Sequence, residues 1–128
     1  MHLSEEQYTR LLERGTVRPL EAPGAPSAPP ISEKAFMAAV VRVATQHGWM
    51  CYHTFDSRKS PMGYPDLTLA RLPWSGRPGE VIWSELKVEA PLTTQQEVWL
   101  ATLSHVSRTE AYLWTPEDMP AIISRLQR

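Results

Sequence analysis

The chain has 128 residues, of which 42% are hydrophobic and five are tryptophan, and this is enough apolar material for one domain with a buried core. Its single cysteine, Cys51, excludes an internal disulfide and fits a reducing compartment, and its apolar stretches are far too short to span a membrane. The formal net charge of −1 excludes a broad basic surface, so any attraction for phosphate must be local, metal-assisted or shared across a dimer. We expect a cytosolic protein with one folded domain.

The first 31 residues are expected to stand apart from that domain. Ser4-Glu5-Glu6-Gln7 has the form of a capping box and predicts a short helix to about Arg14, so residues 1–18 form a helical appendage. Five of the twelve residues from Pro19 to Pro30 are proline, which predicts an extended linker over 19–31. A proline-rich ligand for a partner domain is the alternative for this segment. The folded domain then covers residues 32–128.

A helix is predicted from Glu33 to His47, with Ser32 as its N-cap and Gly48 at its end. Glu33 lies on the apolar stripe of this helix, which predicts a carboxylate that faces inward and needs a partner. The alternative is a first-turn acid that complements the helix dipole. The other members of the stripe recur at helical spacing and are Phe36, Met37, Val40, Val41 and Ala44.

A strand over 49–54 leads into a polar loop that carries two basic residues. Arg58 and Lys59 precede Asp66, so they could hold phosphates at the entrance to a site, or they could form a solvated basic turn. Cys51 and His53 share one face of the strand, but without a second cysteine or a matched histidine they do not indicate a zinc site.

A hairpin is predicted from two strands joined across residues 72–79, the first over 67–71 and the second beginning at Glu80. Glu85 and Lys87 are two residues apart on the second strand, so their side chains point to the same face. Asp66, at the start of the neighbouring strand, can reach the same place. Two converging carboxylates are costly unless a cation lies between them, and hard oxygen ligands suit Mg²⁺ or Mn²⁺. The pattern therefore indicates a divalent-metal site with a lysine beside it, and a buried ion pair between Lys87 and a carboxylate is the alternative.

A second helix is predicted from about Gln95 to Ser107. Either Thr93 with Gln96 or Thr94 with Glu97 is placed to form its capping box, so Gln96 could simply be a cap partner. Gln96 also lies on the buried stripe of this helix. The other members of that stripe are Trp99, Leu100, Leu103 and Val106.

The chain is expected to end in a strand over 110–114 and a helix that begins at Thr115-Pro116. This last helix should bury Met119, Ile122, Ile123 and Leu126. The complete order is a helix, three strands, a helix, a strand and a helix. It indicates an α/β fold with a mixed four-stranded sheet, in which three antiparallel strands precede a right-handed crossover to the fourth and helices cover both faces.

Four motifs follow one another in the chain: Ser32-Glu33 opening a helix, Gly63-x-Pro65-Asp66, Glu85-Leu86-Lys87, and Gln96-x-x-Trp99-Leu100. In this order they resemble the VRR-NUC branch of the PD-(D/E)xK nuclease superfamily, over roughly residues 32–128. A bare PD…ExK pattern occurs by chance, whereas four ordered motifs at compatible spacings are specific. The resemblance implies a restriction-endonuclease-like αβββαβ core and an endonuclease that depends on Mg²⁺ or Mn²⁺.

The resemblance also implies roles for individual residues. Asp66, Glu85 and the main-chain carbonyl of Leu86 would hold one or two metal ions, with Glu33 contacting the metal directly or through water. Lys87 would orient the attacking water or stabilise the phosphorane, and the amide of Gln96 would bond a water or a phosphate.

Stand-alone relatives of this kind imply branched DNA, such as a Holliday junction, as the substrate in a bacterial or phage-infected cell. A junction is resolved by cutting two strands of like polarity, so a homodimer with two symmetrical sites is expected. The strand at 49–54 or the N-terminal helix could supply its contact surface. The alternatives are a nuclease that nicks or processes flaps or duplex, and a non-catalytic nucleic-acid-binding subunit, which intact Asp66, Glu85 and Lys87 argue against.

Overall fold

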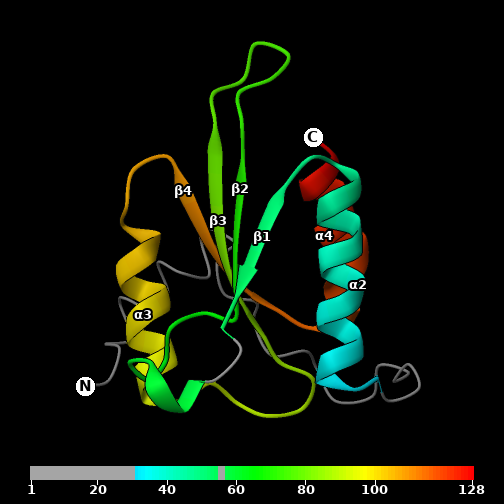
Figure 1. Cartoon of the computed structure of the whole chain (residues 1–128). Helices are drawn as coiled ribbons and strands as arrows, with labels where there is room; N and C mark the ends of the chain where they lie inside the picture. The colour runs from blue at the N-terminus through cyan, green and yellow to red at the C-terminus, as the bar shows by residue number, and fades with distance from the viewer. Residues whose placement is uncertain (1–30, 55–56) are drawn as a thin grey trace.

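The computed structural model describes residues 31–54 and 57–128. The predicted appendage at 1–18 and nearly all of the predicted linker lie outside these ranges. Three α-helices and four strands follow one another in the described part of the chain (Figure 1). They are α2 (Glu33–Gln46), β1 (Met50–His53), β2 (Leu67–Arg71), β3 (Glu80–Leu86), α3 (Thr94–Ser104), β4 (Thr109–Trp114) and α4 (Met119–Gln127), with short 3₁₀ turns at Ser57–Lys59 and Pro116–Asp118.

The four strands form one mixed sheet in the order β1-β2-β3-β4. The β1–β2 and β2–β3 pairs are antiparallel, whereas β3 and β4, which are joined through α3, are parallel. The predicted α/β class, element order and mixed sheet are confirmed. None of the helices in the two described ranges is long and apolar enough to cross a membrane.

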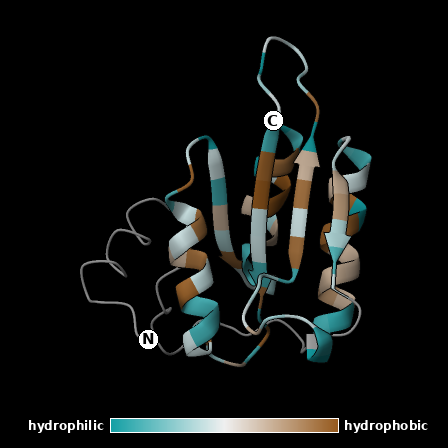
Figure 2. Cartoon of the chain, turned by 60° about the vertical axis from the view of Figure 1, so that its left-hand side comes forward, coloured by the Kyte–Doolittle hydropathy of each residue, from teal (hydrophilic) through white to brown (hydrophobic). Residues whose placement is uncertain are grey.

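Each face of the sheet has its own hydrophobic cluster, because side chains alternate between the faces. Leu67 and Leu69 of β2 are fully buried beneath α2 and α4, which lie side by side on one face (Figure 1). Figure 2 shows this alternation along β2, whose segments are brown and paler in turn. Residues 72–79 connect β2 to β3 and form the tip of a hairpin that projects from the sheet, which we call the projecting hairpin. On the opposite face, α3 packs through Leu100 and Leu103 against Ala111 of β4.

Two apolar residues predicted to be buried are instead exposed. Val106 follows the last residue of α3, which ends at Ser104, and 44% of it is exposed. In α4, Ile122 is fully buried whereas 37% of Ile123 is exposed, because successive residues of a helix lie about 100° apart and only one stripe faces the core.

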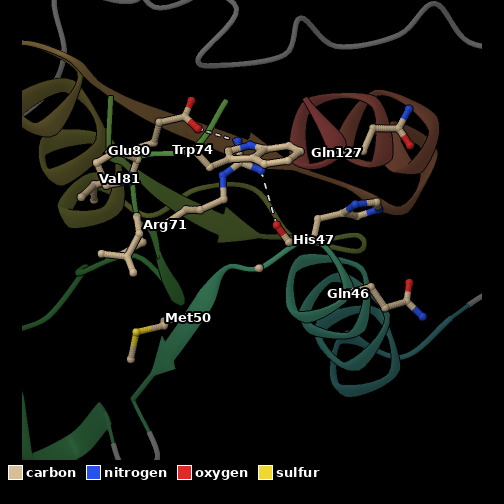
Figure 3. Close-up of a pocket in the computed structure, with 13 residues that line it drawn as sticks. Gln46, His47, Met50, Arg71, Trp74, Glu80, Val81 and Gln127 are labelled. Carbon is tan, nitrogen blue, oxygen red and sulfur yellow. Dashed lines mark hydrogen bonds and ion pairs between the residues drawn. The ribbon is translucent and has the colours of Figure 1, made fainter. Parts of the chain in front are cut away.

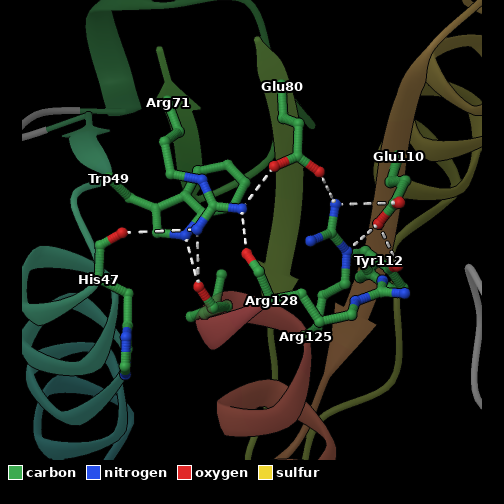
Figure 4. Close-up of polar contacts among 9 residues, drawn as sticks. His47, Trp49, Arg71, Glu80, Glu110, Tyr112, Arg125 and Arg128 are labelled. Atoms are coloured by element: carbon green, nitrogen blue, oxygen red, sulfur yellow. Dashed lines mark hydrogen bonds and ion pairs between the residues drawn. The ribbon is translucent and has the colours of Figure 1, made fainter. Parts of the chain in front are cut away.

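A buried polar cluster ties α4 to the sheet where β2 passes into the projecting hairpin (Figure 4). Arg71 donates to Glu80 at 2.6 Å and to the main-chain carbonyl of Leu126 at 3.1 Å, and its guanidinium lies 4.2 Å from the centre of the Trp49 ring. Arg125 of α4 donates to Glu80 at 2.7 Å and to Glu110 at 2.8 Å. These contacts fix the end of the sheet that lies away from Asp66 and Glu85.

Candidate metal centre

Asp66 and Glu85 meet where β2 begins and β3 ends. The antiparallel register pairs Leu67 with Ser84, so the residue before Leu67 lies opposite the residue after Ser84. The Leu86 main-chain N–H donates to Asp66 Oδ2 at 2.9 Å, which joins the two segments directly. The sequence prediction that these two carboxylates converge agrees with this geometry.

Glu85 is buried without full compensation for its charge. Only 2% of the residue is exposed, and its Oε2 has no hydrogen-bond partner among the described residues. Burial, and next to it the negative charge of Asp66, raise the pKa of Glu85 to about 8, although Lys87 acts in the opposite direction. Without a cation, the site therefore favours the protonated form of Glu85.

Lys87 lies beside this pair on the same face of the sheet. Its Nζ is 3.8 Å from Glu85 Oε1, a distance for a loose ion pair rather than a hydrogen bond, and 15% of its side chain is exposed. The ammonium therefore reduces the electrostatic cost of Glu85 without satisfying Oε2.

The donor set fits a hard divalent cation. Carboxylate oxygens of Asp66 and Glu85 together with the Leu86 carbonyl are the oxygen ligands that Mg²⁺ takes, and Mg²⁺ keeps several waters when one or two carboxylates hold it. No group of three or more His, Cys, Asp or Glu side chains that could hold a metal occurs in residues 31–54 and 57–128. The centre is thus a pair of acids, with an orphaned buried oxygen on Glu85 as the observation that a cation would explain.

Gln96 is the predicted cap partner of α3, and it also contacts the candidate site. Its Oε1 accepts from the Thr93 N–H at 2.8 Å and its main-chain N–H donates to Thr93 Oγ1 at 3.2 Å, which is the Thr93 form of the predicted capping box. Because the cap engages the amide oxygen, the amide nitrogen faces the sheet and donates to Glu85 Oε1 at 2.8 Å. The cap of α3 thereby orients the side chain that contacts the candidate site.

Glu33 is not an inward-facing carboxylate. It is exposed at the first turn of α2, where Ser32 caps the helix by accepting from the Ala35 N–H at 3.0 Å. The prediction that Glu33 faces inward was wrong, because the buried stripe of α2 begins only at Phe36. Glu33 is nevertheless one turn before Met37 on the same side of the helix, and Met37 lines the cavity described next.

A cavity of about 560 Å³ opens beside Asp66. Arg58, Asp66 and Gln96 line it together, which brings one of the two predicted phosphate-binding bases to the candidate site. Lys59 is exposed on the same 3₁₀ turn but does not line the cavity.

Aromatic side chains hold the loop that leads to Asp66 in place, through contacts that no sequence pattern predicted. Trp99 Nε1 donates to the Met62 carbonyl at 3.1 Å, and Trp83 Nε1 donates to the Tyr64 hydroxyl at 2.9 Å. Tyr64 and Trp99 also meet edge to face, with ring centres 5.0 Å apart. We call Tyr64, Trp83 and Trp99 the aromatic bracket. The only signal in the sequence was the position of Trp99 within the Gln96-x-x-Trp99 motif.

Gly63 is required where this loop crosses α3. Its φ is +91°, and a Cβ added there would lie 2.5 Å from the main-chain carbonyl carbon of Gln95. Only glycine combines this backbone conformation with so close an approach.

A second cavity, of about 770 Å³, lies beside the projecting hairpin (Figure 3). Met50, Leu72 and Trp74 line part of it and are 77%, 81% and 57% exposed. Tyr52 of β1, 63% exposed, extends the open apolar area along the edge strand. We call Met50, Tyr52, Leu72 and Trp74 the edge surface.

A scan against protein-family models, a search of curated proteins and a search of solved structures each found no match for this chain.

Proposed function

We propose that the protein is a Mg²⁺-dependent endonuclease that hydrolyses phosphodiester bonds in DNA. The observation that carries the proposal is Glu85, a buried carboxylate with one unpartnered oxygen, placed against Asp66 and flanked by Lys87 and Gln96. The sequence resemblance to VRR-NUC nucleases supports the same conclusion.

Asp66, Glu85 and the Leu86 carbonyl would hold the metal. When bound, Mg²⁺ supplies Lewis-acid polarisation of the scissile phosphate and neutralises the charge that develops on it. Lys87 presents an ammonium group that orients the attacking water or stabilises the pentavalent phosphorane. Gln96, already oriented by its cap, positions solvent or phosphate, and Arg58 binds a phosphate in the adjoining cavity. Glu33 would contribute at most through water from the exposed turn of α2.

A purely structural ion pair explains the same residues less well. A lysine that served only to neutralise Glu85 would be expected within hydrogen-bonding distance, whereas Nζ lies 3.8 Å away. It would also leave unexplained why a second acid, Asp66, lies against an already costly buried carboxylate.

Branched DNA such as a Holliday junction is the proposed substrate, and flap or duplex nicking is the alternative. Synthetic junction, flap and linear duplex are incubated with the protein in Mg²⁺ and in EDTA. We expect the wild-type protein to cleave the junction in Mg²⁺ and not in EDTA, and we expect Asp66→Ala to cleave it in neither. Full Mg²⁺-dependent cleavage by purified Asp66→Ala would refute the site, and preferential cutting of flaps or duplex would select the alternative. Metal-independent binding of DNA without cleavage would identify a non-catalytic binding subunit.

We further propose that two copies associate through the edge surface. Four large apolar side chains gather there beside β1, which is an edge strand of the sheet, and a two-fold axis could place two such strands side by side. Two sites related by that axis would match the two strands that a junction resolvase cuts. A cytoplasmic location remains part of this proposal.

Light scattering tests the dimer. The wild-type protein should have about twice the chain mass of 14.5 kDa at micromolar concentration, and Leu72→Asp should reduce the mass to that of one chain. Val106→Asp is the matched control, because Val106 is also an exposed apolar residue but lies outside the edge surface. Efficient junction cleavage by a protein of 14.5 kDa at every concentration would rule the dimer out.

A further inference from the structure

The segment that carries Asp66 has little regular structure of its own. Residues 60–66 connect a 3₁₀ turn to β2 through a single turn at Met62 and Gly63. No helix or strand hydrogen bonds fix this segment, so the position of the Asp66 carboxylate depends on contacts with neighbouring elements.

Those contacts come from two directions. From α3, the indole N–H of Trp99 holds the Met62 carbonyl at 3.1 Å. From β3, the indole N–H of Trp83 holds the Tyr64 hydroxyl at 2.9 Å, and that hydroxyl lies 3.3 Å from Thr68 Oγ1. The bracket therefore restrains both residues that flank Gly63.

The same helix also holds the other carboxylate. Gln96 and Trp99 are three residues apart, so they lie on one side of α3. Gln96 contacts Glu85 on β3 at 2.8 Å, while Trp99 contacts the loop that leads to Asp66. One turn of α3 thus bridges the two segments whose acids must converge.

We propose that Tyr64 and Trp99 are positioning residues that set the placement of Asp66 against Glu85 and thereby the affinity of the site for a divalent cation. This inference rests on the proposed metal-dependent function. Packing alone would make Tyr64 interchangeable with phenylalanine, and at Trp99 it would predict only the loss of ring volume that Trp49→Phe also causes. Positioning depends instead on the indole N–H and the phenolic hydroxyl.

Trp99→Phe and Tyr64→Phe test the inference, since each keeps a ring and removes one polar group. Trp49→Phe is the matched control, because it removes a buried indole N–H that donates to the Leu126 carbonyl at 2.9 Å, at the other end of the sheet. Mn²⁺ affinity is measured by calorimetry without DNA. Amide hydrogen exchange of Leu86, whose N–H donates to Asp66 Oδ2, is measured by NMR without metal.

Each bracket variant should lower Mn²⁺ affinity about fivefold, the value of one net hydrogen bond, and should speed exchange at Leu86 more than at other β3 amides. Trp49→Phe should lower stability while leaving both readouts unchanged. Unchanged affinity and exchange in the bracket variants, or equal changes in Trp49→Phe, would overturn the inference. If the wild-type protein neither binds Mn²⁺ nor cleaves DNA, the proposed function fails. Leu86 exchange is read without metal, so a normal exchange rate in the variants would separately show that the aromatic bracket does not position Asp66.

Discussion

Replacing Glu85 with glutamine should stabilise the metal-free protein above neutral pH. Glutamine has the same shape, and its amide oxygen can still accept from Gln96 Nε2. Its amide group carries no charge and can donate to Asp66, so the variant removes the cost of a buried carboxylate without leaving a cavity.

The magnitude follows from the pKa of Glu85, which burial and the charge of Asp66 raise from an ordinary 4.5 to about 8. A difference of that size corresponds to roughly 5 kcal/mol between the protonated and ionised forms. The unfolded chain loses the Glu85 proton near pH 4.5, whereas the folded protein retains it until about pH 8. The stabilisation is therefore fully present below about pH 4.5 and is lost as the pH rises through about 8.

Urea denaturation of wild type and Glu85→Gln at pH 5, 7 and 9 in EDTA measures this effect. The wild-type free energy of unfolding should fall relative to that of the variant by a few kcal/mol between pH 5 and pH 9. Excess Mg²⁺ should restore the wild type at pH 9, because binding of a cation favours the ionised acid, and should not affect the variant. A difference between the two proteins that does not change with pH would refute the reasoning.

Other substitutions separate chemistry from stability. Lys87→Ala should keep Mn²⁺ binding by calorimetry but slow single-turnover cleavage about 30- to 1,000-fold, and a normal rate would make Lys87 an ordinary strand residue. In urea denaturation, Gly48→Ala should lower the free energy of unfolding by about 1 kcal/mol because the φ of Gly48 is +84°. Gly63→Ala should lower it clearly more, because its Cβ would also clash with the α3 backbone, and equal losses would contradict that close approach. Arg71→Ala should cost about 2 kcal/mol because it removes a buried guanidinium that bonds Glu80 and the Leu126 carbonyl, although Arg125 and Trp49 still bond those two acceptors. Arg77→Ala on the exposed hairpin should change stability by less than about 0.5 kcal/mol, and similar values for both would show that the cluster contributes little.

Local periodicity was sufficient to predict the fold and the centre of the site. Alternation along β3 placed Glu85 and Lys87 on the face opposite the apolar side chains Ile82 and Leu86, although Glu85 is itself as buried as those two residues. A hairpin between two strands of known length also fixes which residues lie opposite each other. The meeting of Asp66 with Glu85 therefore required no tertiary information beyond the turn.

The contacts that hold the site depend on distances between elements that are remote in sequence. The hydrogen bond from Trp99 to the Met62 carbonyl joins residues 37 positions apart, and no short-range pattern encodes it. The prediction that Glu33 faces inward failed for a related reason. The spacing of apolar residues shows which side of a helix faces the core, but it does not show where along the helix the contact with the neighbouring layer ends. The sequence left two alternatives open for Gln96, a cap partner or a residue beside the candidate site. Only the fold shows that its amide oxygen bonds the cap residue Thr93 while its amide nitrogen bonds Glu85 on the sheet.

The two ends of the sheet show that this chain can neutralise carboxylates when only stability is required. Burial alone would raise the pKa of Glu80, but hydrogen bonds from Arg71 and Arg125 and their charges together lower it. At Glu110 burial again acts to raise the pKa, and hydrogen bonds from Arg125 and Tyr112 together with the nearby arginine charges lower it. Glu85, on the same strand as Glu80, has no arginine partner among the described residues. Burial and the charge of Asp66 raise its pKa, against which only a lysine at 3.8 Å acts. A carboxylate left unstable in its ionised form costs the free protein stability, and a site that binds a cation recovers that cost on binding. This contrast within one sheet is the physical reason to propose a metal site at the end formed by Asp66 and Glu85.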